Sequence, residues 1–305
     1  MPSLKTIRKR ISSVKATQKI TRAMKMVAGA RLNRAQQRIT ALRPYAIKTR
    51  EVLDGVAATM ANRQVAPEYL SDGDGVHPLL QRRTERTVLL LVLSGDRGLC
   101  GGFNANVSKA AWTLYREKKE AGAEVLVATV GRKGKDYLAR RRVTITRDFP
   151  KHYDGLDIGK AKAVSDWIVS RFEKGEVDAV YLVYNEFKSA MTQKTQVEPL
   201  LPLPEPEANK ARKEGALAPS EYIFEPNPRA VLERLVPMYV EISIFRALLE
   251  TQAGFFGAQM TAMDAATNNA KEMIARYTLV YNRARQAAIT KELMEIIGGA
   301  EALKE

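Results

Sequence analysis

The chain has 305 residues, of which 45% are hydrophobic, so it can hold one large domain or two ordinary ones around a real core. Its formal net charge of +15 points to an acidic partner: a nucleic acid, an anionic membrane surface or an acidic protein face. A single cysteine, Cys100, excludes an internal disulfide and a multi-cysteine metal site, and two isolated histidines do not indicate a metal site, so we expect no cofactor and no metal. No run approaches the roughly 20 apolar residues of a membrane span.

The first fifty residues contain fourteen Lys and Arg side chains and no Asp or Glu. From Leu4 to Leu42, mostly apolar or small residues recur in steps of three and four, and the pattern resumes beyond Pro44. This spacing is typical of the contact seam of a helix that winds around another helix. It predicts a coiled-coil helix over residues 1–60, with a bend or a join near Pro44. The arginine-rich start is similar to a mitochondrial transit peptide, but the seam continues far beyond the length of a presequence.

The middle of the chain has a different pattern. Residues 61–86 contain Gly, Asp and Pro without a sustained period, which predicts a linker. Between residues 87 and 200, β-branched runs alternate with helical stretches, which indicates a Rossmann-like α/β domain. The predicted strands are 88–93, 125–130, 143–146 and 179–184, and the predicted helices are 104–121, 133–141 and 160–174. Residues 201–229 are rich in Pro and Glu and are predicted to form a surface connection with one strand near 222–224.

The helical period returns in residues 230–305. From Phe256 to Ala288 the seam steps by fours and threes, and residues 231–305 carry eight basic and nine acidic groups, so the positive charge belongs to the N-terminal helix. Neither long helix can bury its seam alone. We therefore predict a long antiparallel coiled coil of the N- and C-terminal helices with an inserted Rossmann-like α/β domain. The apolar residues after Ala288 predict a tip that sits in an apolar socket of another protein.

The glycine-rich segment 94–102 follows an apolar strand and precedes a helix, a context typical of phosphate-binding loops. It matches neither GxGxxG nor GxxxxGK[ST], so we favour a tight turn that docks another protein through an exposed Asp96–Arg97 pair. Cys100 has no base near it in the sequence, which favours a buried thiol over a nucleophile. A nucleotide-dependent catalytic domain at residues 87–200 remains as an alternative.

A second alternative is a basic coiled-coil protein that binds nucleic acid. Here, however, the basic residues and the seam share the same fifty positions, whereas forked zipper helices free their basic face from the coiled coil. No aromatic residue precedes Tyr45, so no base-stacking platform is available. Because like charges destabilise an isolated helix, the run instead implies an external acidic surface.

Three stretches together resemble one family, the gamma subunit of F-type ATP synthases. They are residues 3–30, which contain KITRAMKMVA, residues 94–104, SGDRGLCGGFN, and residues 263–303, which contain YNRARQAAITKEL. The resemblance implies a non-catalytic rotor shaft inside a ring of three alpha and three beta subunits. Its foot would bind the epsilon subunit and the membrane-embedded c-ring, with Asp96 and Arg97 at that contact. It implies no nucleic-acid partner, and a peripheral location on the cytoplasmic side of a bacterial inner membrane, held only through the c-ring.

The resemblance also implies roles for single residues. Met24 and Lys25 match the positions where the shaft meets an acidic lever of a beta subunit. Arg285 and Gln286 match a pair that engages a loop of beta. The tip held by the apolar sleeve of the ring contains Ile296, Ile297 and Leu303. The segment 253–259, with two glycines, departs from the more polar pattern of the family, and the cysteine pair of the plant redox segment is missing.

Overall fold

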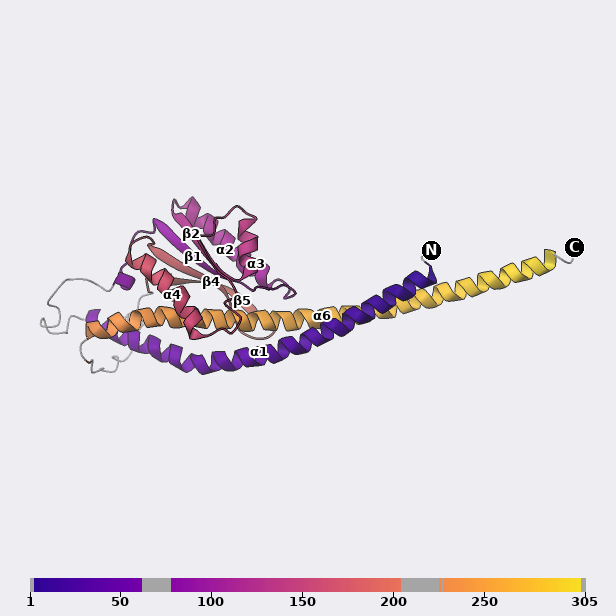
Figure 1. Cartoon of the computed structure of the whole chain (residues 1–305), viewed down its shortest axis with the longest axis horizontal. Helices are drawn as coiled ribbons and strands as arrows, with labels where there is room; N and C mark the ends of the chain where they lie inside the picture. Colours follow the sequence, from indigo (N-terminus) through magenta and orange to yellow (C-terminus); the bar gives the residue numbers. More distant parts are fainter. Residues whose placement is uncertain (1–2, 62–77, 204–224, 226–227, 303–305) are drawn as a thin grey trace, which may run out of the picture. The chain divides into compact units, whose positions relative to one another are not determined.

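The computed structural model describes residues 3–61, 78–203, 225 and 228–302. Its two long helices are α1 (Leu4–Ala61) and α6 (Pro228–Ala302), and all strands lie between them in chain order (Figure 1). Helix α1 continues through Pro44. The chain forms two compact units, one of Met1–Ala30 with Gln259–Glu305 and one of Arg31–Ala258.

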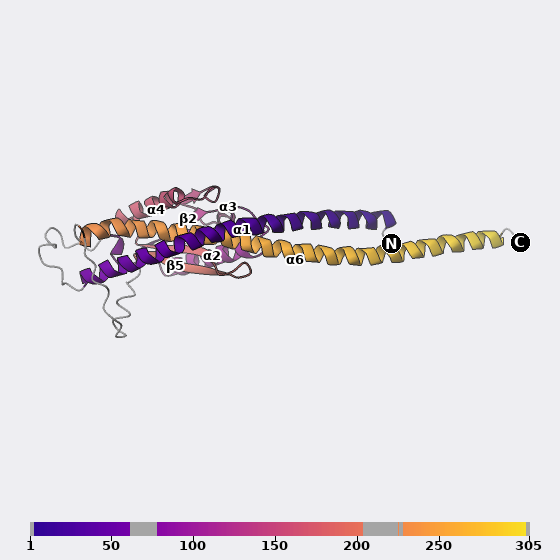
Figure 2. The ribbon, with the colours of Figure 1, turned by 90° about the horizontal axis from the view of Figure 1, so that it is seen from below.

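The first unit is an antiparallel helix pair, as the seams predict. The Thr21 and Thr267 hydroxyls are 2.8 Å apart, and Arg8 Nη2 donates to the Tyr281 hydroxyl at 2.6 Å. The residue number therefore falls along α6 as it rises along α1, and both views show the segments side by side (Figures 1 and 2). The described seam positions of α1 in this unit are all buried or half-buried: 4, 7, 11, 14, 18, 21, 25 and 28.

Small residues let the two backbones of this pair approach closely. Ala28 on α1 is 1% exposed and Ala270 on α6 is 5% exposed. A Cβ added at Gly29 would lie 3.4 Å from the Met260 sulfur. A larger side chain at Ala28 would therefore have to displace the opposite helix.

In the second unit the remaining parts of α1 and α6 are again antiparallel. The Arg31 guanidinium lies 5.8 Å from the centre of the Phe256 ring, and the Tyr45 hydroxyl donates to the Met238 sulfur at 3.4 Å. The α1 seam stays buried here through Leu32, Ala35 and Ile39.

A five-stranded sheet forms the core of the second unit, in the order β3-β2-β1-β4-β5. The strands are β1 (Thr87–Leu93), β2 (Glu124–Val130), β3 (Arg147–Phe149), β4 (Ala179–Phe187) and β5 (Gln193–Leu201). The first four are mutually parallel and β5 is antiparallel to β4. Leu91 in β1 pairs with Ala128 on one side and Leu182 on the other. The Rossmann-like prediction is confirmed.

The connecting elements are η2 (Pro78–Leu80), α2 (Phe103–Glu120), α3 (Arg132–Ala139) and α4 (Ile158–Glu173). Helices α2 and α3 pack on the face of β1 that presents Val88, Leu90 and Val92. The residues that alternate with these in β1 are fully buried as well. Burial on both faces explains why β1 is apolar throughout rather than alternating. Figure 1 shows α4 apart from α2 and α3, with strands between them.

Two strand predictions differ from the structure. The third strand lies at Arg147–Phe149 rather than 143–146. Val143 is buried against the α2–α3 face from a loop, so its apolar character reflects packing rather than pairing. Strand β5 was not predicted because its sequence, QKTQVEPLL, is polar, and an edge strand tolerates polar residues and a proline. The strand predicted near 222–224 lies outside the described residues.

The two glycines of segment 253–259 have a packing reason. A Cβ at Gly254 would meet the Phe103 ring of α2 at 2.9 Å. A Cβ at Gly257 would lie 3.1 Å from the Ala190 carbonyl oxygen, in the turn between β4 and β5. Glycine lowers helix propensity, but here it lets α6 touch the α/β domain directly.

Candidate protein-interaction surfaces

The exposed face of α1 is positively charged. Of the fourteen basic side chains in the first fifty residues, twelve are exposed and two, Lys25 and Arg50, are half-buried. Many of them make no ion pair with any residue that the structure describes: Lys5, Lys9, Arg10, Lys15, Lys19 and Arg22. Their repulsion is therefore not relieved within the described part of the chain, so this face fits an acidic surface of another protein.

Lys25 occupies a seam position and Met24 lies next to it, and both are half-buried. The Lys25 ammonium is 2.5 Å from the Asp264 carboxylate of α6, so this charge already has a partner within the chain. The Lys25–Asp264 pair was not predicted, although the regular seam spacing places Asp264 across from Lys25 in an antiparallel pair. The expected contact of Met24 and Lys25 with an acidic lever stays a prediction.

The last described part of α6 is apolar and exposed. Beyond Ala288 the seam has no α1 segment opposite it, because α1 begins at Leu4 and the pair is antiparallel. Ile296 is 69% exposed and Ile297 is 53% exposed. The other exposed apolar side chains of this segment are Ile289, Leu293 and Met294. Such a surface is costly in water and indicates a binding partner. Leu303 lies outside the described residues.

Arg285 and Gln286 lie on the outward side of α6, one turn before that apolar segment. Both are exposed, whereas the neighbouring seam residues Ala284 and Ala288 are half-buried. Their side chains therefore extend from the helix pair and are available to another protein.

The glycine-rich loop is a closed turn held by one asparagine. The Gly95 N–H donates to Asn104 Oδ1 at 2.8 Å, and Asn104 Nδ2 donates to the Arg97 carbonyl oxygen at 2.9 Å. Cys100 is buried, as predicted, and burial raises the pKa of its thiol, which disfavours the reactive thiolate. Asp96 is half-buried rather than exposed, because its carboxylate accepts the Arg132 N–H at 3.0 Å. The prediction of an exposed Asp96–Arg97 pair is therefore wrong for Asp96 and right for Arg97.

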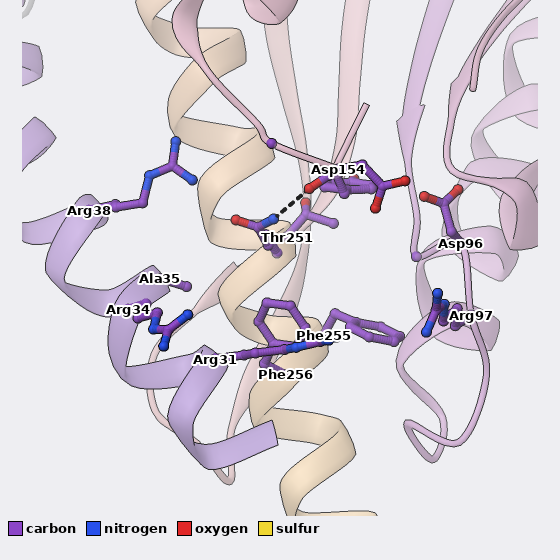
Figure 3. Close-up of a pocket in the computed structure, with 14 residues that line it drawn as sticks. Arg31, Arg34, Ala35, Arg38, Asp96, Arg97, Asp154, Thr251, Phe255 and Phe256 are labelled. Atoms are coloured by element: carbon purple, nitrogen blue, oxygen red, sulfur yellow. Dashed lines mark hydrogen bonds between the residues drawn. The ribbon is translucent and has the colours of Figure 1, made fainter. Parts of the chain in front are cut away.

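A hollow of about 420 Å³ opens in the second unit between α1, α6 and the loops that follow β1 and β3 (Figure 3). This hollow was not predicted from the sequence, although three of the arginines that line it, Arg31, Arg34 and Arg38, recur at helical spacing. The charged residues that line it are Arg31, Arg34, Arg38, Arg97, Asp96 and Asp154.

A second hollow, of about 320 Å³, is lined by Glu250 and Arg246 of α6. Arg246 Nη2 donates to both carboxylate oxygens of Glu198 at 2.9 Å, and the Tyr184 hydroxyl donates to Glu198 at 3.0 Å. Burial raises the pKa of Glu250 to about 7, against the opposing effect of Arg246, and Glu186 and Glu198 add to the increase. Within the described part of the chain, Glu250 Oε2 has no hydrogen-bond partner.

The described residues contain neither a metal-binding cluster nor a membrane-spanning helix. No group of three or more His, Cys, Asp or Glu side chains with metal-binding geometry occurs among them. None of the described helices is both long and apolar enough to cross a membrane.

Comparisons with known proteins agree on one family. The family model described as ATP synthase matches residues 3–303. A gamma chain of ATP synthase from Sorangium cellulosum is 56% identical and one from Anaeromyxobacter sp. Fw109-5 is 47% identical, each over all of both chains.

Solved structures share the fold at lower identity. A Euglena gracilis mitochondrial ATP synthase chain has a TM-score of 0.63 at 18% identity, and covers 98% of this chain and 94% of its own. A Tetrahymena thermophila chain has a TM-score of 0.59 at 22% identity, and covers 81% and 99%. The fold is thus shared with distant solved structures, and the matches of the family model and of the full-length relatives show that this chain belongs to the gamma-chain family of the ATP synthases.

Proposed function

We propose that this chain is the central rotor shaft of an F-type, proton-translocating ATP synthase. As a gamma chain it is a non-catalytic subunit: it couples rotation of the c-ring to the conformational cycle of catalytic sites on other subunits. The distant structural relatives come from assemblies described as a rotor and as a central stalk with a c-ring, which supports this role. Neither the nucleic-acid alternative nor a nucleotide-dependent enzyme is supported by these relatives.

The observation that carries the proposal is the helix pair with a charged outer face. Twelve exposed basic side chains lie on α1, while the seam beneath them is filled by α6. A helix pair of this kind transmits rotation because its register is fixed by buried side chains such as Ala28 and Thr21. Exposed charges interact with an acidic surface weakly and through water, so they avoid deep energy wells that would stop rotation.

The partners follow from this role. The ring of three alpha and three beta subunits would surround the helix pair, with Met24, Lys25, Arg285 and Gln286 at its contacts. The exposed apolar end of α6, with Ile296 and Ile297, would turn in an apolar sleeve of that ring. Leu303, outside the described residues, would belong to the same contact. Such a sleeve would hold the tip by non-directional burial, which does not depend on one rotational position.

The loop after β1 would belong to the rotor's foot. Asp96 and Arg97 would contribute to the contact with the epsilon subunit and the c-ring, Arg97 through its exposed side chain and Asp96 by holding the loop. The chain would then be a peripheral subunit on the cytoplasmic side of a bacterial inner membrane, attached through the c-ring alone. Rotation of this asymmetric shaft would give each catalytic site a different neighbour in turn, and so shift the three sites among their conformations.

Reconstitution tests the proposal. Purified chain added to a gamma-depleted ATP synthase is expected to restore ATP synthesis driven by a proton gradient, while the chain alone hydrolyses no ATP. Native mass spectrometry of the restored complex should find one copy of this chain for every three beta subunits. A complex that regains no coupled synthesis, or that holds three copies of this chain, would contradict the rotor role.

A further inference from the structure

We propose that the hollow between α1, α6 and the loops after β1 and β3 binds the phosphate group of a small molecule (Figure 3). Arg31, Arg34 and Arg38 line it from successive turns of α1, opposite the loop that carries Arg97. Arginine suits this role because its planar fork of N–H donors matches phosphate oxygens. This site is separate from the proposed function and does not depend on it.

The arginines of the hollow have donors to spare. Arg31, Arg34 and Arg97 make no ion pair with any residue that the structure describes. Arg31 packs over the Phe256 ring, and Arg38 donates to the Leu156 carbonyl oxygen, which fixes their stems. Side chains fixed in this way lose less entropy when they bind an anion.

Two buried hydroxyl groups lie behind the wall of the hollow. Thr251 is 0% exposed, and the Tyr153 hydroxyl is buried beside it. Neither oxygen is accessible from the hollow, so the donors available to a phosphate group come from the arginines.

The location is the usual ligand-binding edge of a parallel sheet. Within the sheet, β2 and β3 lie on one side of β1, and β4 lies on its other side. The loop after β1 therefore lies at the point where the strand order reverses, and ligands of open α/β sheets bind there. In this chain that loop supplies Gly95, Asp96 and Arg97 to the hollow.

Charge and size limit the ligand. Four arginines and two aspartates line the hollow, an excess of two positive charges that matches a phosphate dianion. The Asp96 carboxylate accepts the Arg132 N–H, so one of the two negative charges is already engaged. A volume of about 420 Å³ exceeds that of phosphate alone and falls in the range of small-molecule sites. The remaining space is bordered by Phe255 and accommodates an organic portion.

Calorimetric titration of the full chain with inorganic phosphate, pyrophosphate and ADP tests the proposal, at about 150 mM salt to suppress non-specific association. We expect saturable binding of one pyrophosphate or ADP per chain. Arg34→Gln should weaken it at least about tenfold, since a charge-assisted hydrogen bond is lost. Arg22→Gln removes the same charge from an exposed position of α1 outside the hollow and should change it less than about twofold.

Two further variants keep the result interpretable if Arg34→Gln unfolds. Arg97→Gln tests the opposite wall, and Arg31→Gln tests a second arginine of α1. Both should weaken binding with an unchanged circular-dichroism spectrum. The proposal is overturned by the absence of saturable binding, or by equal losses in Arg34→Gln and Arg22→Gln.

Discussion

The Glu250 carboxyl lies in a polar cluster of the second unit, between α6 and the strands β4 and β5. Arg246 is next to it but is already shared with both oxygens of Glu198. Glu250 is 9% exposed, and one of its oxygens has no hydrogen bond to any residue that the structure describes. Burial therefore has the largest effect on this carboxyl and raises its pKa from 4.5 to about 7.

This pKa predicts a pH-dependent stability. In the unfolded chain Glu250 ionises near pH 4.5, and in the folded chain near 7, so the folded state holds the proton more tightly. Between these values rising pH costs stability, up to about 3 kcal/mol, and the loss is complete above pH 7. The side chain in the Glu250→Gln variant is neutral at every pH. The free energy of unfolding of this variant should therefore rise relative to that of the parent as the pH increases through this range.

Urea unfolding at about pH 5 and pH 8 measures the gain. The difference between the variant and the parent should be more favourable at the higher pH. Glu272→Gln, at an exposed position of the same helix, serves as the control and should show little change with pH. An equal effect of Glu250→Gln at both pH values would show that Glu250 titrates normally.

Arg285 gives a second test at the scale of one residue. Its side chain is exposed, so Arg285→Ala should change the free energy of unfolding by less than about 0.5 kcal/mol. If Arg285 contacts a beta subunit, the variant should lower ATP synthesis and torque in the reconstituted complex. Arg283→Ala, equally exposed two residues earlier, is the matched control. Unchanged synthesis and hydrolysis would remove Arg285 from the contact surface.

At this scale the sequence predicted outward positions better than partners within the chain. Arg285 and Ile296 were expected at the surface and are exposed. The Lys25–Asp264 pair and the Asp96–Arg132 contact were not predicted, because each joins segments far apart in the chain. Contacts of that kind depend on register and loop geometry, which a single sequence does not specify.

Among the elements, periodicity predicted the long helices and the buried parallel strands. The α1 seam remains buried or half-buried from Leu4 through Leu53, because a repeat held over many turns has one structural solution. The predictions of short elements failed for different reasons. Strand β5 was not predicted because it is a polar edge strand, and Val143 was placed in a strand although it is buried from a loop. The division into five segments at residues 60, 86, 200 and 229 stays a prediction.

The seam predicts how the helix pair responds to a larger residue. Ala28 is buried where α1 and α6 approach closely, so Ala28→Leu should destabilise the chain by about 1–3 kcal/mol through overpacking. Ala30→Leu is the control, because Ala30 is exposed on the same turn. Thermal unfolding followed by circular dichroism compares them, and a coiled coil is ruled out at Ala28 if both variants melt like the parent.

On the scale of the whole molecule, the net charge is concentrated in one part of the sequence. The fourteen basic residues of the first fifty carry nearly all of the net charge of +15, and twelve of them are exposed. A field of one sign attracts an acidic partner from a distance and falls steeply with ionic strength. Assembly with the alpha–beta ring should therefore slow as salt rises.

Removing part of this field tests the whole-molecule argument. We expect a fourfold Lys/Arg→Gln variant at Lys5, Lys9, Arg10 and Lys15 to associate with the ring more slowly, on the order of tenfold at low salt. Its rate should also depend less on salt. The four side chains are exposed, so the fold should not change.

The matched control removes four exposed charges from the α/β domain instead, at Lys109, Lys133, Lys162 and Lys174. Both variants have the same net charge, so a difference between them isolates the position of the charge from its amount. Stopped-flow association at several salt concentrations provides the rates. If the two variants slow equally, total charge governs assembly, and the exposed face of α1 has no special part in docking; if only the first slows, the acidic partner lies against that face.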